Sequence, residues 1–156
     1  MPRYRLTLEY DGGPFVGWQR QANGLSVQQV VEDAIFALAG ERAATIAAGR
    51  TDAGVHALGQ VAHVDIARAF PPETVRDALN FHMKPHPVAV LTAAMTAPDF
   101  HARFSARMRS YVYRIANRRA RLALDRGRKW WISAPLDEAS MHEAAGFLVG
   151  KHDFTT

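Results

Sequence analysis

The chain of 156 residues contains no cysteine, which excludes disulfide bonds and metal sites built on thiolates. The same absence fits the reducing cytoplasm, and we expect the protein there. It also has no run of eighteen apolar residues, so the sequence predicts no helical membrane span. The residues that are present, 48% hydrophobic and 22% charged, are typical of a globular fold.

Acidic residues are scarce in one part of the chain. Residues 103–129 hold ten Lys and Arg side chains and a single acid, Asp125, for a net charge of +9, whereas the remaining residues sum to −5. A basic block on a mildly acidic body is typical of a protein that binds a polyanion. The other interpretation is a solvated, arginine-rich surface.

The first ninety residues alternate between strand and helix patterns. Alternating apolar positions predict strands at residues 4–10 and 60–66, and short apolar runs predict strands at residues 45–48 and 88–94. One helix begins after Ser26, with Gly40 at its end, and a second begins at the proline pair 71–72. The order β-α-β-β-α-β predicts an α+β fold of the ferredoxin-like type, with an antiparallel sheet and both helices on one face. Such a sheet is also the plan of a common RNA-binding module.

The rest of the chain predicts the start of a second α/β domain. A polar connector leads to expected strands at residues 110–117 and 129–132, and a helix begins at Asp137. Two strands and one helix seldom form a stable unit alone. We therefore expect domains at residues 1–104 and 105–156, the second incomplete.

The side chains best suited to catalysis lie in residues 49–60, the polar stretch between two expected strands. It holds three glycines, and Asp52 is its only carboxylate, with Arg50 two positions away. Glycines allow a tight turn and the close approach of a ligand. A carboxylate kept ionised by a nearby cation suits a nucleophile or a base. Ordinary turn chemistry is the other interpretation of the same residue types.

The string Gly-Arg-Thr-Asp-Ala-Gly-Val-His-Ala at residues 49–57 resembles the signature of the tRNA pseudouridine synthase A family. Further blocks in the order typical of that family support the resemblance. They are residues 9–12 with 17–21, residues 100–106 followed by 109–113, and residues 152–155. Four ordered blocks are far more specific than any one of them.

The resemblance implies an isomerase that converts uridine to pseudouridine at positions 38 to 40 of the tRNA anticodon stem-loop. It implies no metal and no organic cofactor, and a homodimer at full length. Asp52 matches the catalytic aspartate, Tyr111 the tyrosine that contacts the target base, Arg50 the arginine beside the nucleophile, and Arg103 the block that lines the cleft. Family members continue for roughly another hundred residues, so this chain resembles the N-terminal portion.

Two other functions are open to the same residues. Asp52, His56, His63 and Asp65 are possible ligands of a metal-dependent hydrolase, because imidazole and carboxylate bind divalent cations. A non-catalytic RNA-binding module, or an inactive fragment of the synthase, would explain the fold and charge without turnover.

Overall fold

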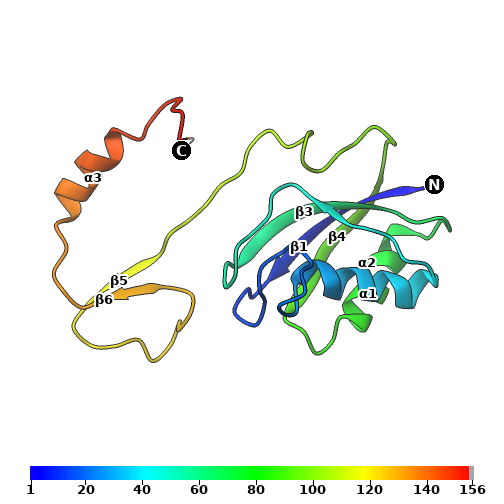
Figure 1. Cartoon of the computed structure of the whole chain (residues 1–156), viewed down its shortest axis with the longest axis horizontal. Coiled ribbons are helices and arrows are strands. Elements are labelled where there is room, and N and C mark those ends of the chain that lie inside the picture. Colours follow the sequence, from blue (N-terminus) through cyan, green and yellow to red (C-terminus); the bar gives the residue numbers. More distant parts are fainter. Residues whose placement is uncertain (155–156) are drawn as a thin grey trace. The chain divides into compact units, whose positions relative to one another are not determined.

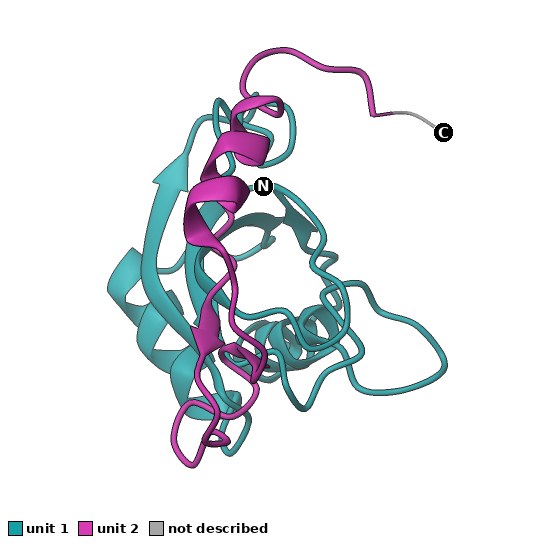
Figure 2. Ribbon diagram, turned by 90° about the vertical axis from the view of Figure 1, so that its left-hand side faces the viewer, with its two compact units in different colours: residues 1–110 teal, residues 111–156 magenta. Residues whose placement is uncertain are grey.

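The computed structural model describes residues 1–154, which separate into two compact units at residues 110 and 111 (Figure 2). Unit 1 contains β1 (Arg3–Tyr10), α1 (Val27–Ala39), β2 (Ile46–Ala47), β3 (Ala57–Asp65), α2 (Pro72–His82) and β4 (Val88–Thr96). Unit 2 contains β5 (Ile115–Asn117), β6 (Trp130–Ile132) and α3 (Glu138–Gly146). No helix within residues 1–154 has both the length and the hydrophobicity needed to cross a membrane.

The four strands of residues 3–96 form one antiparallel sheet in the order β2-β3-β1-β4 (Figure 1). β1 is central because it pairs with both β3 and β4; Leu6 stands opposite Ala62 on one side and Ala93 on the other. The predicted α+β class and antiparallel sheet are confirmed, and the element order and strand order fit a ferredoxin-like domain.

Both helices of unit 1 pack on the face of the sheet that carries the alternate apolar residues of β1. The Ser26 side chain accepts a hydrogen bond from Gln29 N at the start of α1, and Gly40 ends it in a left-handed conformation, as the sequence predicts. The core joins strand and helix side chains that are fully or nearly fully buried, including Tyr4, Leu6, Leu8, Val31, Ile35, Val64, Val75 and Leu79. This packing fixes the loops at the sheet's end.

Strand lengths differ from the predicted ones. β2 spans only Ile46–Ala47, and β3 begins at Ala57, inside the polar stretch. The stretch before β3 is therefore a shorter loop, residues 48–56, which we call the Asp52 loop.

Unit 2 has no buried residue among positions 111–154. β5 and β6 pair in parallel, with Ile115 opposite Trp130. The predicted strand 110–117 is wrong in its first half, because residues 110–114 lie outside any strand. α3 begins directly after Asp137, where the sequence predicts the start of a helix, and none of its residues is buried. Thr155, at the end of the fourth resemblance block, lies outside the described residues.

Candidate active site on the Asp52 loop

Two hydrogen bonds to β3 hold the start of the Asp52 loop. Ala48 N donates to Val61 O at 2.7 Å, and the Gln60 side-chain amide donates to Gly49 O at 2.7 Å. Within the loop, Val55 N donates to Asp52 O at 3.1 Å, which closes a turn around the aspartate. The carboxylate therefore projects from a turn in a loop whose start is fixed to β3.

Two glycines of the segment after β1 bring a second loop against this one. A Cβ on Gly17 would lie 2.6 Å from Thr51 O and 3.2 Å from Asp52 C, and Gly17 has φ of +112°. A Cβ on Gly12 would overlap Val55 O. Only glycine permits such close packing of two backbones. Residues 9–21 and 49–57, two blocks singled out in the sequence, thus meet in space.

Aromatic side chains support the loop from within the core. Tyr10 OH lies 2.9 Å from Thr51 Oγ1, and Trp18 N donates to Thr51 O at 2.9 Å. The Trp18 ring is buried, with its centroid 6.1 Å from that of Tyr10. These aromatics therefore fill the edge of the core beneath the loop.

His56 ties the end of the loop to the turn after β1. Its Nδ1 atom lies 3.1 Å from Gly12 N, which donates to it, and 3.1 Å from Asp11 Oδ1. Asp11 Oδ1 also accepts from Gly13 N at 2.9 Å. His56 is thus part of the contact between the two loops.

Asp52 is exposed, and its carboxylate has no hydrogen-bond or ion-pair partner within residues 1–154. Arg50 is also exposed, and in this part of the chain no ion pair joins it to Asp52. The sequence had indicated a cation beside the carboxylate; the structure places both side chains on one loop without pairing them. An unpartnered carboxylate on a braced loop is available to attack an electrophilic carbon or to accept a proton.

The connector after β4 covers part of the other face of the sheet. The Arg3 guanidinium donates to Pro98 O at 2.6 Å and to Phe100 O at 2.8 Å, while its Nε and Nη2 atoms each bond the Asp65 carboxylate at 2.7 Å. This pairing lowers the pKa of Asp65. The connector is therefore anchored to the first and third strands.

His63 is buried beneath this connector. Its Nδ1 accepts a hydrogen bond from Ala102 N at 3.1 Å. Burial, with smaller contributions from Arg3 and His101, lowers the pKa of His63. A neutral imidazole thus holds the backbone next to Arg103.

The metal-site hypothesis fails on this geometry. His63 bonds Ala102 and Asp65 pairs with Arg3. Residues 1–154 contain no group of three His, Asp or Glu side chains placed to hold a metal ion.

Arg103 is exposed, and its side chain has no hydrogen bond or ion pair within the described residues. Its backbone is held by Arg109, whose Nη2 donates to Arg103 O at 3.1 Å. Arg109 Nε and Nη2 also donate to Ala48 O, at 3.0 and 2.6 Å. Sequence reasoning did not select Arg109, because nothing local separates it from the other cations of the basic block.

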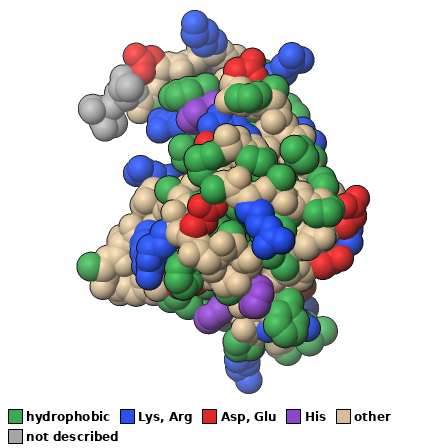
Figure 3. Space-filling view, turned by 90° about the vertical axis from the view of Figure 1, so that its right-hand side faces the viewer, with side chains coloured by type: hydrophobic (Ala, Val, Ile, Leu, Met, Phe, Trp, Pro, Cys, Tyr) green, Lys and Arg blue, Asp and Glu red, His purple; other side chains and the backbone are tan. Residues whose placement is uncertain are grey.

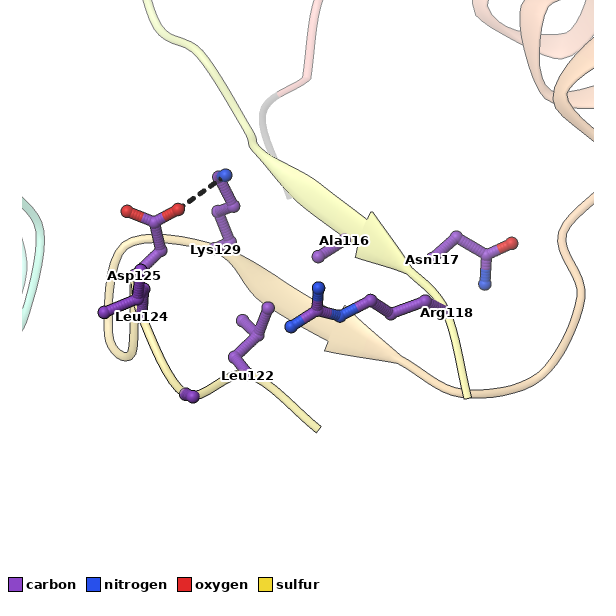
Figure 4. Close-up of a pocket in the computed structure, with 8 residues that line it drawn as sticks. Ala116, Asn117, Arg118, Leu122, Leu124, Asp125 and Lys129 are labelled. Carbon is purple, nitrogen blue, oxygen red and sulfur yellow. Dashed lines mark ion pairs between the residues drawn. The ribbon is translucent and has the colours of Figure 1, made fainter. Parts of the chain in front are cut away.

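Tyr111 belongs to unit 2, where it is 67% exposed and lies before β5. Unit 2 also has a shallow pocket of about 440 Å³ beside β5 and β6 (Figure 4). An ion pair of 2.6 Å joins Lys129 and Asp125 at its rim. None of the predicted site residues lines this pocket.

The cations of residues 103–129 are all exposed. Some are engaged locally; the Arg118 guanidinium, for example, donates to Ala120 O and Arg121 O. Within residues 1–154, the side chains of five have no hydrogen bond or ion pair: Arg103, Arg107, Arg114, Arg119 and Arg121. On the face shown in Figure 3, the Lys and Arg side chains lie among Asp and Glu side chains and do not form one basic patch. Unpaired arginines are suited to phosphate contacts.

The chain was compared with known proteins. A family described as tRNA pseudouridine synthase matches residues 7–105. Proteins named tRNA pseudouridine synthase A are 62% identical over all 156 residues in Nitrobacter winogradskyi and in Paramagnetospirillum magneticum, and 60% identical in Parvibaculum lavamentivorans. The chain spans 61%, 61% and 63% of the length of these relatives. The family match includes the Asp52 loop, the segment packed against it and the connector up to Ser105. The chain therefore belongs to the tRNA pseudouridine synthase family.

Proposed function

We propose that the chain carries the nucleophile-bearing part of a tRNA pseudouridine synthase that acts at positions 38 to 40 of the anticodon stem-loop, with Asp52 as the catalytic residue. The observation that carries this proposal is the exposed Asp52 carboxylate, which has no partner among the described residues, on a loop held by close backbone packing. The relatives' shared name supports the reaction and the tRNA substrate.

The reaction is an isomerisation that needs no redox partner. The bond between uracil N1 and ribose C1′ breaks, the base turns, and C5 bonds to C1′. The proton on C5 leaves to solvent, and N1 takes one up. Asp52 either attacks C1′ covalently or removes the 2′ proton, and both routes need an ionised carboxylate without a permanent cation partner.

The remaining predicted residues take binding roles. The uridine must leave its stack to reach Asp52, and the exposed Tyr111 ring is suited to hold an extruded base. Two roles are open for Arg50: filling the gap left in the stem, or balancing the charge of Asp52. Arg103 and the unpaired arginines of the basic block would contact phosphates.

Three further predictions belong to the protein at its relatives' full length. We expect a homodimer, a cytoplasmic location, and catalysis without a metal or an organic cofactor. An RNA-binding module without turnover is the second candidate, which the exposed cations of residues 103–129 favour.

Tritium release from tRNA labelled at uridine C5 tests the proposal, because the C5 proton is lost only when the new carbon–carbon bond forms. We expect release by the chain and none by Asp52→Ala, with pseudouridine mapped to positions 38 to 40. The matched control is Asp33→Ala, which removes a carboxylate from α1. If both the chain and a version extended to its relatives' length bind tRNA without releasing tritium, the RNA-binding module is the correct function.

A further inference from the structure

Arg109 is distinguished from the other cations of the basic block by what its guanidinium contacts. Nε and Nη2 both donate to Ala48 O, at 3.0 and 2.6 Å, and Nη2 donates to Arg103 O at 3.1 Å. Ala48 opens the Asp52 loop and lies four positions before Asp52. One side chain therefore joins the loop that bears the carboxylate to the segment that bears Arg103.

This contact means that both backbone polar groups of Ala48, the first residue of the loop, are hydrogen-bonded. Ala48 N donates to Val61 O at 2.7 Å, so the strand side of the residue is held by β3. Its carbonyl is held only by Arg109 among residues 1–154. A planar guanidinium can donate to two carbonyls in fixed directions, whereas a lysine ammonium is a point charge on a flexible stem.

Arg107 provides the contrast. It lies two positions earlier on the same segment and is also exposed, yet its side chain has no hydrogen bond or ion pair within the described residues. The two arginines contribute the same charge to any RNA contact. Only Arg109 connects two parts of the candidate site.

We propose that Arg109 is a positioning residue, which holds the Asp52 loop and the segment of Arg103 in a fixed position relative to each other. Its role in catalysis rests on the proposed function. Arg109 acts through Ala48 and Arg103 and touches no reacting atom. Its geometry matters more than its charge, since charge alone is supplied by its neighbours.

Amide hydrogen exchange of the chain without RNA tests the structural part. Arg109→Lys and Arg109→Gln are compared with the matched pair Arg107→Lys and Arg107→Gln. In both Arg109 variants, we expect severalfold faster exchange in peptides covering residues 48–55 and 102–106, whose amides are hydrogen-bonded at Ala48, Val55, Ala102 and Ser105. The Arg107 pair should match the wild type. Unchanged exchange in Arg109→Gln overturns the proposal.

Steady-state tritium release tests the catalytic part. Arg109→Lys keeps the charge, so we expect KM for tRNA to be unchanged and kcat to fall about tenfold or more. Arg107→Gln should raise KM and leave kcat unchanged. If Arg109→Lys keeps wild-type kcat, or if Arg109→Gln changes only KM as Arg107→Gln does, Arg109 is an ordinary phosphate contact and the proposal is wrong. If neither the chain nor a version extended to its relatives' length turns over, the result counts against the proposed function, while the exchange result still decides the role of Arg109.

Discussion

Gly12 and Gly17 pack closely against the Asp52 loop, and alanine substitutions can separate two effects at such positions. One is the cost of a positive φ, and the other is the collision of the added Cβ with neighbouring atoms. Four Gly→Ala substitutions form the test. At Gly17 an alanine meets both a positive φ and the Thr51 carbonyl, and at Gly12 it meets only the Val55 carbonyl. At Gly54, φ is +79° but the added Cβ meets open space, and at Gly59 neither problem arises.

The expected losses in the free energy of unfolding follow from two costs, that of a positive φ and that of the steric overlap. A positive φ on a residue with a Cβ costs about 1–3 kcal/mol, and inserting a methyl group into filled space costs about 1–3 kcal/mol. Gly17→Ala carries both and should lower the free energy of unfolding by roughly 2–6 kcal/mol. Gly54→Ala and Gly12→Ala each carry one term, and Gly59→Ala should stay within about 0.5 kcal/mol of the wild type.

Thermal unfolding and tritium release measure the two consequences. For a unit of this size, 1 kcal/mol corresponds to roughly 4 °C in Tm. Gly12→Ala can relieve its overlap only by displacing the Asp52 loop, and a shift of about 1 Å costs roughly 100-fold in kcat. Gly54→Ala should lose stability with a smaller loss of kcat. The packing argument fails if Gly12→Ala and Gly17→Ala are as stable and as active as Gly59→Ala.

Three other predictions concern protonation, charge and stacking. Because the pKa of His63 is lowered in the folded protein, the unfolded chain binds more protons, and the free energy of unfolding should fall as pH drops below about 6.5. The amide oxygen of His63→Asn can accept the Ala102 N–H without titrating, so thermal unfolding between pH 5 and 8 should show a smaller loss of stability at low pH for this variant. If the stability of the variant and that of the wild type fall in parallel, His63 is not the group responsible. Replacing Arg119 and Arg121 together with Gln should weaken tRNA binding and reduce the slope of log K against log salt by about 1–2, whereas an unchanged slope would mean that neither arginine contacts phosphate. Tyr111→Ala should lose about 10- to 100-fold in kcat/KM and Tyr111→Phe much less; equal losses would assign the role to the hydroxyl group instead.

Local patterns predicted the features that depend on neighbouring residues. The Ser26 cap and the end of α1 at Gly40 follow from side chains within one turn. The alternation that buries Ala62 and Val64 is equally local.

Contacts between distant segments could not be predicted in this way. The connector that buries His63 comes almost forty residues later in the chain. The packing of the glycines after β1 on the Asp52 loop depends on β1 pairing with β3. Arg109 was one of ten cations until the fold placed it beside Ala48. The strand expected through Tyr111 is shorter because β6 offers only three residues for pairing.

Substitution of Asp52 by Asn tests the central claim most directly, since it removes the charge and keeps the shape of an exposed side chain that has no partner within residues 1–154. The measurement is single-turnover tritium release from C5-labelled tRNA, with tRNA affinity determined on the same samples. Our account predicts release by the wild type, none by Asp52→Asn, and the same affinity for both. Release by Asp52→Asn at the wild-type rate would contradict the assignment of the catalytic residue.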